Sequence, residues 1–304
     1  MTKQELTNMV AEILSQMNGT EQPKVKGSDY KTLILEQDKK KTCYHDGDFV
    51  PDVTALDLRK LYLTENAADP EKFKKMKLKT PARLGSGKVG PRYKTLTMLR
   101  FRADHAAAQD AVFSEMDADY AKQHDLLPVK TRCDSKDEYL TRPDLGRCFD
   151  EHNAKTIKGV IDTPPRVQLV VGDGLSSAAI AANAADCLAA IRDGLKLKGI
   201  ETGKAIFVKY CRVGAGDAIG DITGCELVCV LVGERPGLVT DKSMSAYITY
   251  KPHTGVSESS RTVVSNIHAQ GTPAVEAGAH VAELIDKILK KKVSGVGLHL
   301  GDAL

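Results

Sequence analysis

Apolar residues recur with two different periods along this chain, and the two patterns alternate in its second half. Short runs rich in Val, Leu and Ile cover residues 167–172, 205–210 and 226–233, which is typical of strands buried on both faces. Longer stretches with apolar residues three or four positions apart cover 178–197 and 273–292, as expected of helices. Strands that alternate with helices predict an α/β fold, with a mostly parallel sheet and flanking helices.

The chain ahead of this sheet has a mainly helical pattern. Apolar residues between 56 and 63 predict one helix, and a second is predicted from 95 to about 116, with Leu99 on its core side. We therefore expect a helical region over residues 52–150, followed over 151–304 by the domain that contains the sheet.

The first residues form a separate amphipathic segment. Thr2 and Glu5 have the spacing of a capping box, and the apolar residues that follow, up to Met17, fall on one side of a helix. We predict an amphipathic helix over residues 1–19. A flexible linker is predicted over 20–51, which is polar, of mixed charge and interrupted by Gly and Pro. Two roles remain open for the helix: docking on its own domain, or acting as a detachable targeting peptide.

Composition and charge narrow the function classes. The net charge is +3 and 27% of the 304 residues are charged, so neither nucleic acid nor an anionic membrane is expected as the main partner. No apolar stretch suits a signal peptide or a membrane span, and the 7 cysteines include no CxxC pair. We expect a soluble intracellular protein with reduced thiols.

The end of the first strand offers candidate binding groups. In VVGDGLSS, Asp173, Gly174 and Ser176 stand where the strand gives way to a helix, and the free N–H groups of such a junction suit phosphate, ribose or amide ligands. The full GxGxxG spacing is missing, however. The alternative is a turn that only caps the helix, through Ser176 or Ser177.

The end of the third strand offers a second set, in the motif GERPGL. Glu234 is a candidate acceptor for amide or ribose donors, and Arg235 stands beside it. The alternative is a solvated surface ion pair of little energetic weight. Because open α/β sheets bind ligands at the carboxyl ends of their strands, we expect this loop and the Asp173 loop to face one crevice.

These residues do not by themselves specify a reaction. The sequence has no HExxH, P-loop, nucleophile elbow or His/Cys cluster with zinc spacing, and no carboxylate pair stands out as an acid and a base on one element. We therefore predict neither catalytic residues nor a metal site in this chain.

Six motifs, in contrast, are similar in order and content to those of one family. They resemble the small subunit of ethanolamine ammonia-lyase and lie between about residues 84 and 289. The motifs are GKVGPR (87–92), LRFRADHAAAQDAV (99–112), YLTRPDLGR (139–147), DGLSS (173–177), GERPGL (233–238) and SNIHAQGTP (265–273).

The resemblance implies a two-subunit lyase that converts ethanolamine to acetaldehyde and ammonia with adenosylcobalamin. In that family the large subunit is a TIM barrel that holds the substrate, and the small subunit is a Rossmann-like domain on one side of the cofactor, here residues 151–304. Six large and six small subunits, and benzimidazole retained on cobalt, are also implied. Residues 1–19 resemble peptides that direct enzymes into bacterial microcompartments, so a shell protein in the bacterial cytoplasm is a further expected partner.

Motif by motif, the resemblance implies three cobalamin contacts. They are Val213 in the segment CRV, Glu234 in GERPGL, and Val263 in RTVVSNIH, where family members can have Cys. Valine at this last position excludes a thiol role, so we expect a backbone or apolar contact. The complete expected cofactor site is Val213, Glu234, Val263, Asp173, Gly174, Ser176 and Arg235.

Two other interpretations stay open at this point: a stand-alone nucleotide-dependent α/β enzyme, and a non-catalytic scaffold that links a lyase to a microcompartment shell. A further prediction concerns NIHAQG, which has the spacing of the histidine signature that ligates cobalt in other cobalamin enzymes. Asn266 replaces the carboxylate that raises the basicity of that ligand. We therefore predict that His268 does not ligate cobalt.

Overall fold

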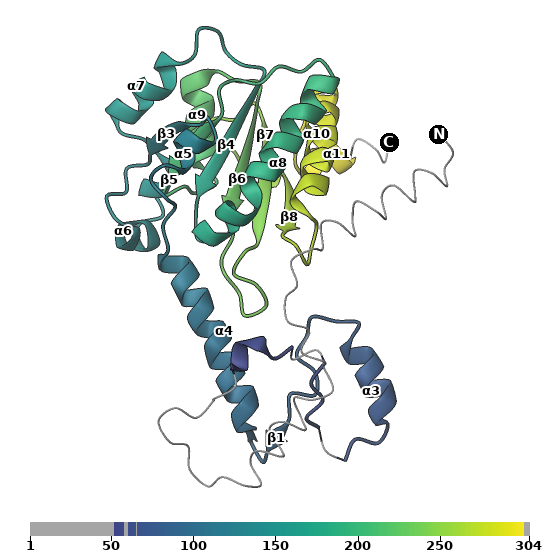
Figure 1. Ribbon diagram of the computed structural model, residues 1–304. Helices are drawn as coiled ribbons and strands as arrows, with labels where there is room; N and C mark the ends of the chain where they lie inside the picture. Colours follow the sequence, from purple (N-terminus) through teal and green to yellow (C-terminus); the bar gives the residue numbers. More distant parts are fainter. Residues whose placement is uncertain (1–51, 58–59, 65, 301–304) are drawn as a thin grey trace. The chain divides into compact units, whose positions relative to one another are not determined.

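A sheet of six strands organises the protein (Figure 1). The computed structural model describes residues 52–57, 60–64 and 66–300, and all of these but Asp52 belong to the unit Val53–Leu304. The strands lie in the order β3-β5-β4-β6-β7-β8. Their bounds are β3 (Leu127–Lys130), β4 (Val167–Asp173), β5 (Ile206–Lys209), β6 (Leu227–Gly233), β7 (Met244–Tyr250) and β8 (Arg261–Ile267).

The predicted α/β class is confirmed, but the sheet is mixed. The neighbours β3, β5, β4 and β6 run parallel to one another. β7 is antiparallel to β6, and β8 is antiparallel to β7. The parallel strands β4, β5 and β6 were predicted from their apolar runs, and a further strand was expected at residues 247–250, within β7, but the antiparallel direction of β7 and β8 was not predicted.

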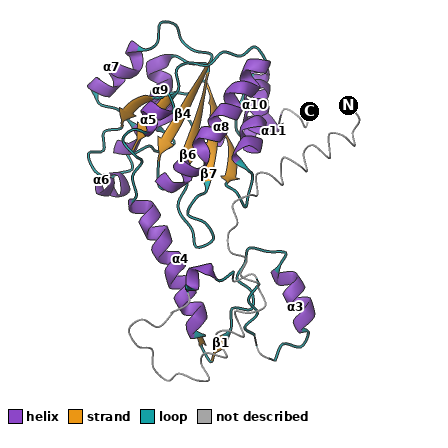
Figure 2. Ribbon diagram, viewed as in Figure 1, coloured by secondary structure: helices purple, strands orange, loops and turns teal. Residues whose placement is uncertain are grey.

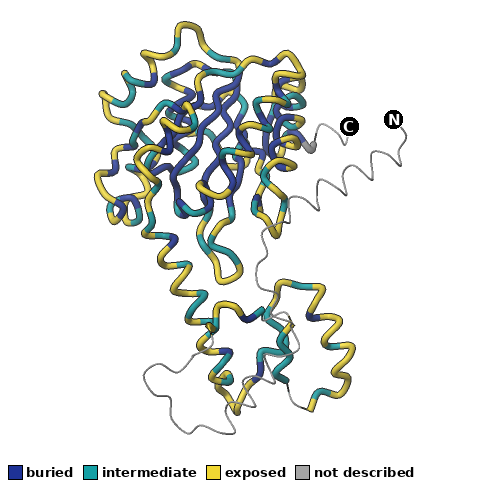
Figure 3. Tube along the Cα trace, in the orientation of Figure 1, coloured by how far each residue is buried: buried dark blue, intermediate teal, exposed yellow. Residues whose placement is uncertain are grey.

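Helices cover both faces of the sheet (Figures 1 and 2). On one face lie α8 (Ser177–Leu197) and α10 (Ala274–Lys291), with α11 (Val296–Leu300) contributing to the same core. On the other lie α7 (Glu151–Gly159) and α9 (Ala215–Thr223). Alternate residues of β4 and β6 point to the two faces, and every position of both strands is buried (Figure 3). Burial on both faces is why these strands appear as continuous apolar runs.

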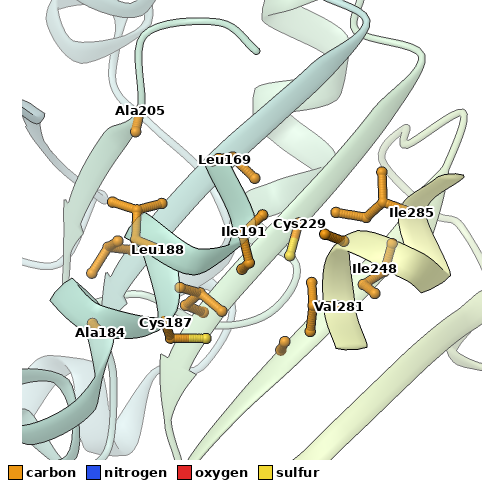
Figure 4. Close-up of a cluster of buried hydrophobic side chains, with 14 of the residues drawn as sticks. Leu169, Ala184, Cys187, Leu188, Ile191, Ala205, Cys229, Ile248, Val281 and Ile285 are labelled. Atoms are coloured by element: carbon orange, nitrogen blue, oxygen red, sulfur yellow. The ribbon is translucent and has the colours of Figure 1, made fainter. Parts of the chain in front are cut away.

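The larger core lies between the sheet and the pair α8 and α10. Two glycines allow the helices to approach closely, because a Cβ atom at Gly194 would lie 2.7 Å from that of Ala282 and one at Gly278 would lie 2.6 Å from that of Ala190. A larger side chain at either position would force the helices apart and loosen this packing. The core side chains drawn in Figure 4 include Leu169, Cys187, Ile191, Cys229, Ile248 and Ile285.

Two predictions ahead of the sheet are wrong. Between residues 52 and 64 the described chain is helical only in the 3-10 turn η1 (Val53–Ala55), because the leucines there do not repeat with a helical period. The helix expected from residue 95 is confirmed as α4 (Thr95–Phe113), but Leu99 is 43% exposed and the residues buried on α4 are Thr97 and Ala111. The other elements are α3 (Pro70–Lys77), β1 (Lys88–Val89), β2 (Arg92–Tyr93), α5 (Tyr120–Gln123), α6 (Lys136–Thr141), η2 (Leu145–Arg147) and η3 (Glu258–Ser260).

The two edge strands, β3 and β8, were not predicted. β3 contains Pro128, which lacks an N–H group and is tolerated at a sheet edge, and it lies before residue 151, where we expected the sheet-containing domain to begin. β8 is polar and partly exposed, so it has no continuous apolar run. The helix and linker expected over residues 1–19 and 20–51 lie outside the described residues.

Candidate functional site

The two candidate loops lie side by side at the edge where the parallel strands end. Asp173 is the last residue of β4, and Glu234 follows the last residue of β6. The two strands pair directly, with Gly172 opposite Val232. The N–H of Leu175 donates to the carbonyl of Gly233 at 3.1 Å. The loops therefore share one edge of the sheet, as ligand-binding loops do in open α/β folds.

A tyrosine that the sequence did not indicate lies beside two of the expected cobalamin contacts. Tyr247 on β7 donates its hydroxyl hydrogen to Oε1 of Glu234 at 2.6 Å. Tyr247 is also the cross-strand partner of Val263 on β8, so their side chains stand on the same face of the sheet. Val213, in the turn before α9, packs against the same apolar cluster as Tyr247. Glu234 and Val263 thus lie directly beside Tyr247, and Val213 borders the same apolar cluster.

This face combines apolar surface with a hydrogen-bond acceptor. Val263 is 47% exposed, whereas Val213, Glu234 and Tyr247 are half-buried. Burial raises the pKa of Tyr247, and the hydrogen bond to the Glu234 carboxylate raises it further. The phenol therefore remains a proton donor at neutral pH, and it fixes the orientation of the Glu234 carboxylate.

A buried ion pair connects the elements on either side of this face. The guanidinium of Arg261 on β8 donates to both carboxylate oxygens of Asp217 on α9, at 2.7 and 2.8 Å. The two side chains are only 3% and 8% exposed. Because α9 follows Val213 and β8 contains Val263, this bidentate pair helps to fix the positions of both valines.

The loop after β4 uses its polar groups internally. The hydroxyl of Ser176 accepts from the N–H of Ala179 at 3.0 Å and donates to the carbonyl of Asp241 at 2.6 Å. Ser176 therefore caps α8, as the alternative interpretation of this motif holds. Gly174 and Gly233 allow the two loops to touch, because a Cβ atom at Gly233 would lie 2.1 Å from the carbonyl oxygen of Ser176.

Asp173 is fully buried in a group of charged residues. Its carboxylate accepts from the hydroxyl of Ser177 at 2.6 Å. Burial raises the pKa of Asp173 and lowers that of the nearby Lys136, whose Nζ donates to the carbonyl of Gly174 at 3.1 Å. Asp173, Gly174 and Ser176 thus hold the strand–helix junction together, while Arg235 is exposed. Their contact with a cofactor stays a prediction.

The motif YLTRPDLGR supports the turn that contains Val213. The N–H of Arg212 donates to the carbonyl of Gly146 at 2.9 Å. The guanidinium of Arg212 lies 4.4 Å from the ring centroid of Tyr139 and donates to the carbonyl of that residue at 2.9 Å. Two motifs that are distant in the sequence therefore form one structural unit beside the site.

His268 stands in a tight turn after β8. The ring Nδ1 of His268 accepts from the backbone N–H of Gln270 at 3.3 Å, and the backbone N–H of His268 donates to the carbonyl of Thr272 at 3.1 Å. The hydrogen bond from Gln270 gives the imidazole a local role in the turn. That His268 does not ligate cobalt stays a prediction.

Sequence reasoning missed Tyr247, Arg261 and Asp217. The alternation in MSAYITY could have placed Tyr247 on the face opposite Ala246 and Ile248, but nothing local marks it as the partner of Glu234. Arg261 and Asp217 are 44 residues apart, so only the fold shows that they pair.

The part of the chain that the structure describes offers neither a metal site nor a membrane span. There, no group of three or more His, Cys, Asp or Glu side chains could hold a metal ion. Nor is any helix of these residues long and apolar enough to cross a membrane.

Comparison with known proteins agrees with the resemblance of the motifs. The family model of the ethanolamine ammonia-lyase light chain matches residues 70–299. The ethanolamine ammonia-lyase small subunit of Clostridium perfringens is 53% identical over 298 residues, which cover 98% of this chain and 100% of that protein. The small subunits of Clostridioides difficile and Listeria monocytogenes are each 52% identical over 298 residues, with the same coverage.

Proposed function

Because this chain belongs to the family of ethanolamine ammonia-lyase small subunits, we propose that it binds adenosylcobalamin on the face formed by Val213, Glu234, Tyr247 and Val263. The chain is one subunit of a lyase complex, and in our proposal the catalytic residues belong to the large subunit. The small subunit would hold one side of the cofactor at the interface between the two.

The observation that supports this proposal is that Tyr247 contacts Glu234 and pairs with Val263, while Val213 borders the same apolar cluster. A corrin ring is a broad macrocycle with carboxamide arms at its edge. The exposed Val263 suits the apolar part of such a ring, and the Glu234 carboxylate suits the N–H groups of an arm. The residues present therefore fit the cofactor.

In this proposal the two subunits have different roles around the cofactor. When bound, the cofactor supplies the radical chemistry that turns ethanolamine into acetaldehyde and ammonia. The residues of this chain bind the cofactor, orient it and exclude water from one side. In the Rossmann-like sheet domain, Asp173, Gly174 and Ser176 would act mainly by shaping the loops, and Arg235 by meeting the edge of the corrin. The polar atoms of Asp173 and Ser176 are used internally, which does not favour a stand-alone nucleotide enzyme.

The proposal also includes the nitrogen ligand of cobalt. We propose that cobalt keeps its own benzimidazole and that His268 stays in its turn. The electron paramagnetic resonance spectrum of bound cob(II)alamin, recorded with unlabelled and 15N-labelled benzimidazole, tests this. A nitrogen splitting that ignores the label and disappears in His268→Ala would show that the protein supplies the ligand.

The expected partner is a TIM-barrel large subunit, in an assembly of six large and six small subunits. Exposed apolar residues on α4, among them Met98, Leu99 and Phe113, offer a surface for it. We also propose that residues 1–19 bind a microcompartment shell protein in the bacterial cytoplasm. Activity should appear only with the large subunit and adenosylcobalamin, and ammonia release by the purified small subunit alone would refute this division of labour.

Substitutions in the assembled complex test the cofactor face. Glu234→Ala should raise the Kd of cobalamin roughly tenfold or more, because a hydrogen bond to a charged group contributes about 1.5–3 kcal/mol. Tyr247→Phe should raise it about threefold, since the carboxylate loses the donor that orients it. If Tyr247 acts through Glu234, the double variant should bind no more weakly than Glu234→Ala alone.

Another tyrosine of β7 provides a matched control. Tyr250 donates to Oε1 of Glu226 at 3.4 Å, at the other end of the strand. Tyr250→Phe removes the same hydroxyl from a similar pair and should leave the Kd unchanged. An unchanged Kd in both Glu234→Ala and Tyr247→Phe, in a complex that still binds cobalamin, would show that the cofactor lies elsewhere.

A further inference from the structure

Ser245 on β7 has a buried hydroxyl without a hydrogen-bond partner among the described residues. The other buried serines of this part of the chain all use their hydroxyls. Ser176 donates to the carbonyl of Asp241, Ser177 to the carboxylate of Asp173, and Ser294 to the carbonyl of Ser260. A buried hydroxyl without a partner is destabilising, so its presence in a central part of the fold requires an explanation.

The strand next to Ser245 is irregular at this point. Met244 pairs with Ile267 and Ala246 with Val264, so the single residue Ser245 stands opposite two residues of β8, Ser265 and Asn266. Asn266 has a φ of 59°, in the left-handed region. Such a bulge interrupts the regular ladder and redirects side chains, and bulges occur frequently beside functional sites.

A cavity of about 370 Å³ adjoins these residues. It is continuous with the proposed cofactor face, because Glu234 and Arg235 also line it. Pockets that enclose a whole drug-sized ligand measure about 300–1,000 Å³, so this one, at the lower end of that range, has room for one arm of a macrocycle. The remaining polar lining includes Ser243, Ser245, Ser265 and Asn266.

The lining indicates the chemistry of the ligand. One acidic and one basic residue, Glu234 and Arg235, balance each other, and the remaining polar groups are neutral hydroxyls and an amide. A hydroxyl donates one hydrogen bond and accepts others, so it can serve a carbonyl oxygen and an NH2 group alike. This combination suits a neutral group with both a donor and an acceptor better than a phosphate or an ammonium.

We infer that the Ser245 cavity is a subsite for a primary carboxamide arm, which the Ser245 hydroxyl binds. The inference rests on the proposed function, since carboxamide arms edge the corrin of cobalamin. In the complex, the bulge would shape the subsite and the Ser245 hydroxyl would gain a hydrogen-bond partner.

The stability of the chain without its partner provides the first test. If the Ser245 hydroxyl forms a hydrogen bond only with a bound ligand, Ser245→Ala should leave the midpoint of thermal unfolding unchanged or raise it. The substitution removes a buried hydroxyl that has no partner in the free chain. Ser294→Ala is the matched control, since it removes a buried hydroxyl that has protein partners and should lower the midpoint. A decrease in Ser245→Ala as large as that in Ser294→Ala would assign the hydroxyl a structural role and overturn the inference.

Cobalamin binding to the assembled two-subunit complex is the second test. Cyanocobalamin is compared with its monocarboxylates, in each of which one carboxamide is hydrolysed to a carboxylate. The wild-type complex should bind one monocarboxylate much more weakly than the parent. Ser245→Ala should raise the Kd of cyanocobalamin roughly 3- to 10-fold. It should also reduce the ratio between the Kd of that monocarboxylate and the Kd of cyanocobalamin. Ser294→Ala should change neither value.

The outcomes separate this inference from the proposed function. If the wild-type complex binds cobalamin and Ser245→Ala has the same Kd, the subsite is refuted while the proposed function stands. If the discrimination between arms is unchanged in the variant, the hydroxyl does not contact a carboxamide and the inference is likewise refuted. A wild-type complex that binds no cobalamin refutes the proposed function itself.

Discussion

The buried ion pair between Arg261 and Asp217 should contribute several kcal/mol to the stability of the chain, roughly 3–5 kcal/mol if one partner is removed. Asp217→Asn keeps the shape of the side chain but removes its charge, which leaves a guanidinium that is 3% exposed without its main carboxylate. Breaking a buried ion pair by removing one partner costs about 3–5 kcal/mol, because the remaining charge stays buried. Asp217 also lies in the first turn of α9, where a negative charge is favoured by the helix dipole.

A second carboxylate reduces the expected loss. Nε of Arg261 donates to Glu258 at 2.6 Å, but the Glu258 side chain is 73% exposed and compensates only in part. We therefore expect Asp217→Asn to lower the free energy of unfolding by about 3 kcal/mol, at the lower end of that range. For a domain of this size the midpoint of thermal unfolding should fall by roughly 6–12 °C.

Circular dichroism of the purified chain during heating and during urea unfolding measures this change. Asp144→Asn is the control, because Asp144 accepts from Nε and Nη2 of Arg142 at 3.0 and 2.8 Å in an equally bidentate pair whose side chains are about 60% exposed. Water screens that pair, so its loss should have no measurable effect on the free energy of unfolding. If Asp217→Asn changes stability as little as Asp144→Asn does, burial does not strengthen the pair and this reasoning is wrong.

Three further predictions rest on the structure and a fourth rests on the sequence. Gly233→Ala should destabilise the chain by about 3 kcal/mol in urea unfolding, because its Cβ atom would lie 2.1 Å from a backbone oxygen; a neutral effect would mean that the loop after β4 moves freely. Cys148, which is partly exposed, should react with a thiol reagent at about pH 8 while Cys187 should not, since burial raises the pKa of Cys187 to about 12; equal labelling by mass spectrometry would contradict this. Burial raises the pKa of Asp173 in the folded state above the ordinary value of 3.8, so the wild-type protein loses stability as the pH rises through the folded-state pKa. Asp173→Asn cannot titrate, so its unfolding free energy should rise relative to that of the wild type over the same pH range. A difference in unfolding free energy between the two proteins that is constant with pH would contradict this prediction. Deletion of residues 1–19 should leave the complex active in solution but absent from microcompartments, and failure to assemble would show that the segment is structural.

The locally encoded elements of this protein could be predicted from its residues alone. The buried strands β4 and β6 and the helices α8 and α10 were predicted closely, because each repeats its apolar residues with the period of its own structure. The motifs also identified the family and placed two candidate loops at the same edge of the sheet.

The edge strands and the contacts within the site became visible only in the folded chain. β3 and β8 have weak local signals, because an edge strand needs neither a full set of N–H donors nor two apolar faces. The partners of Tyr247 and Arg261, and the unpartnered hydroxyl of Ser245, likewise have no signature in the residues around them. Hydrogen bonds and ion pairs between distant segments depend on which strands become neighbours, and the energy of each pair depends on how deeply the fold buries it.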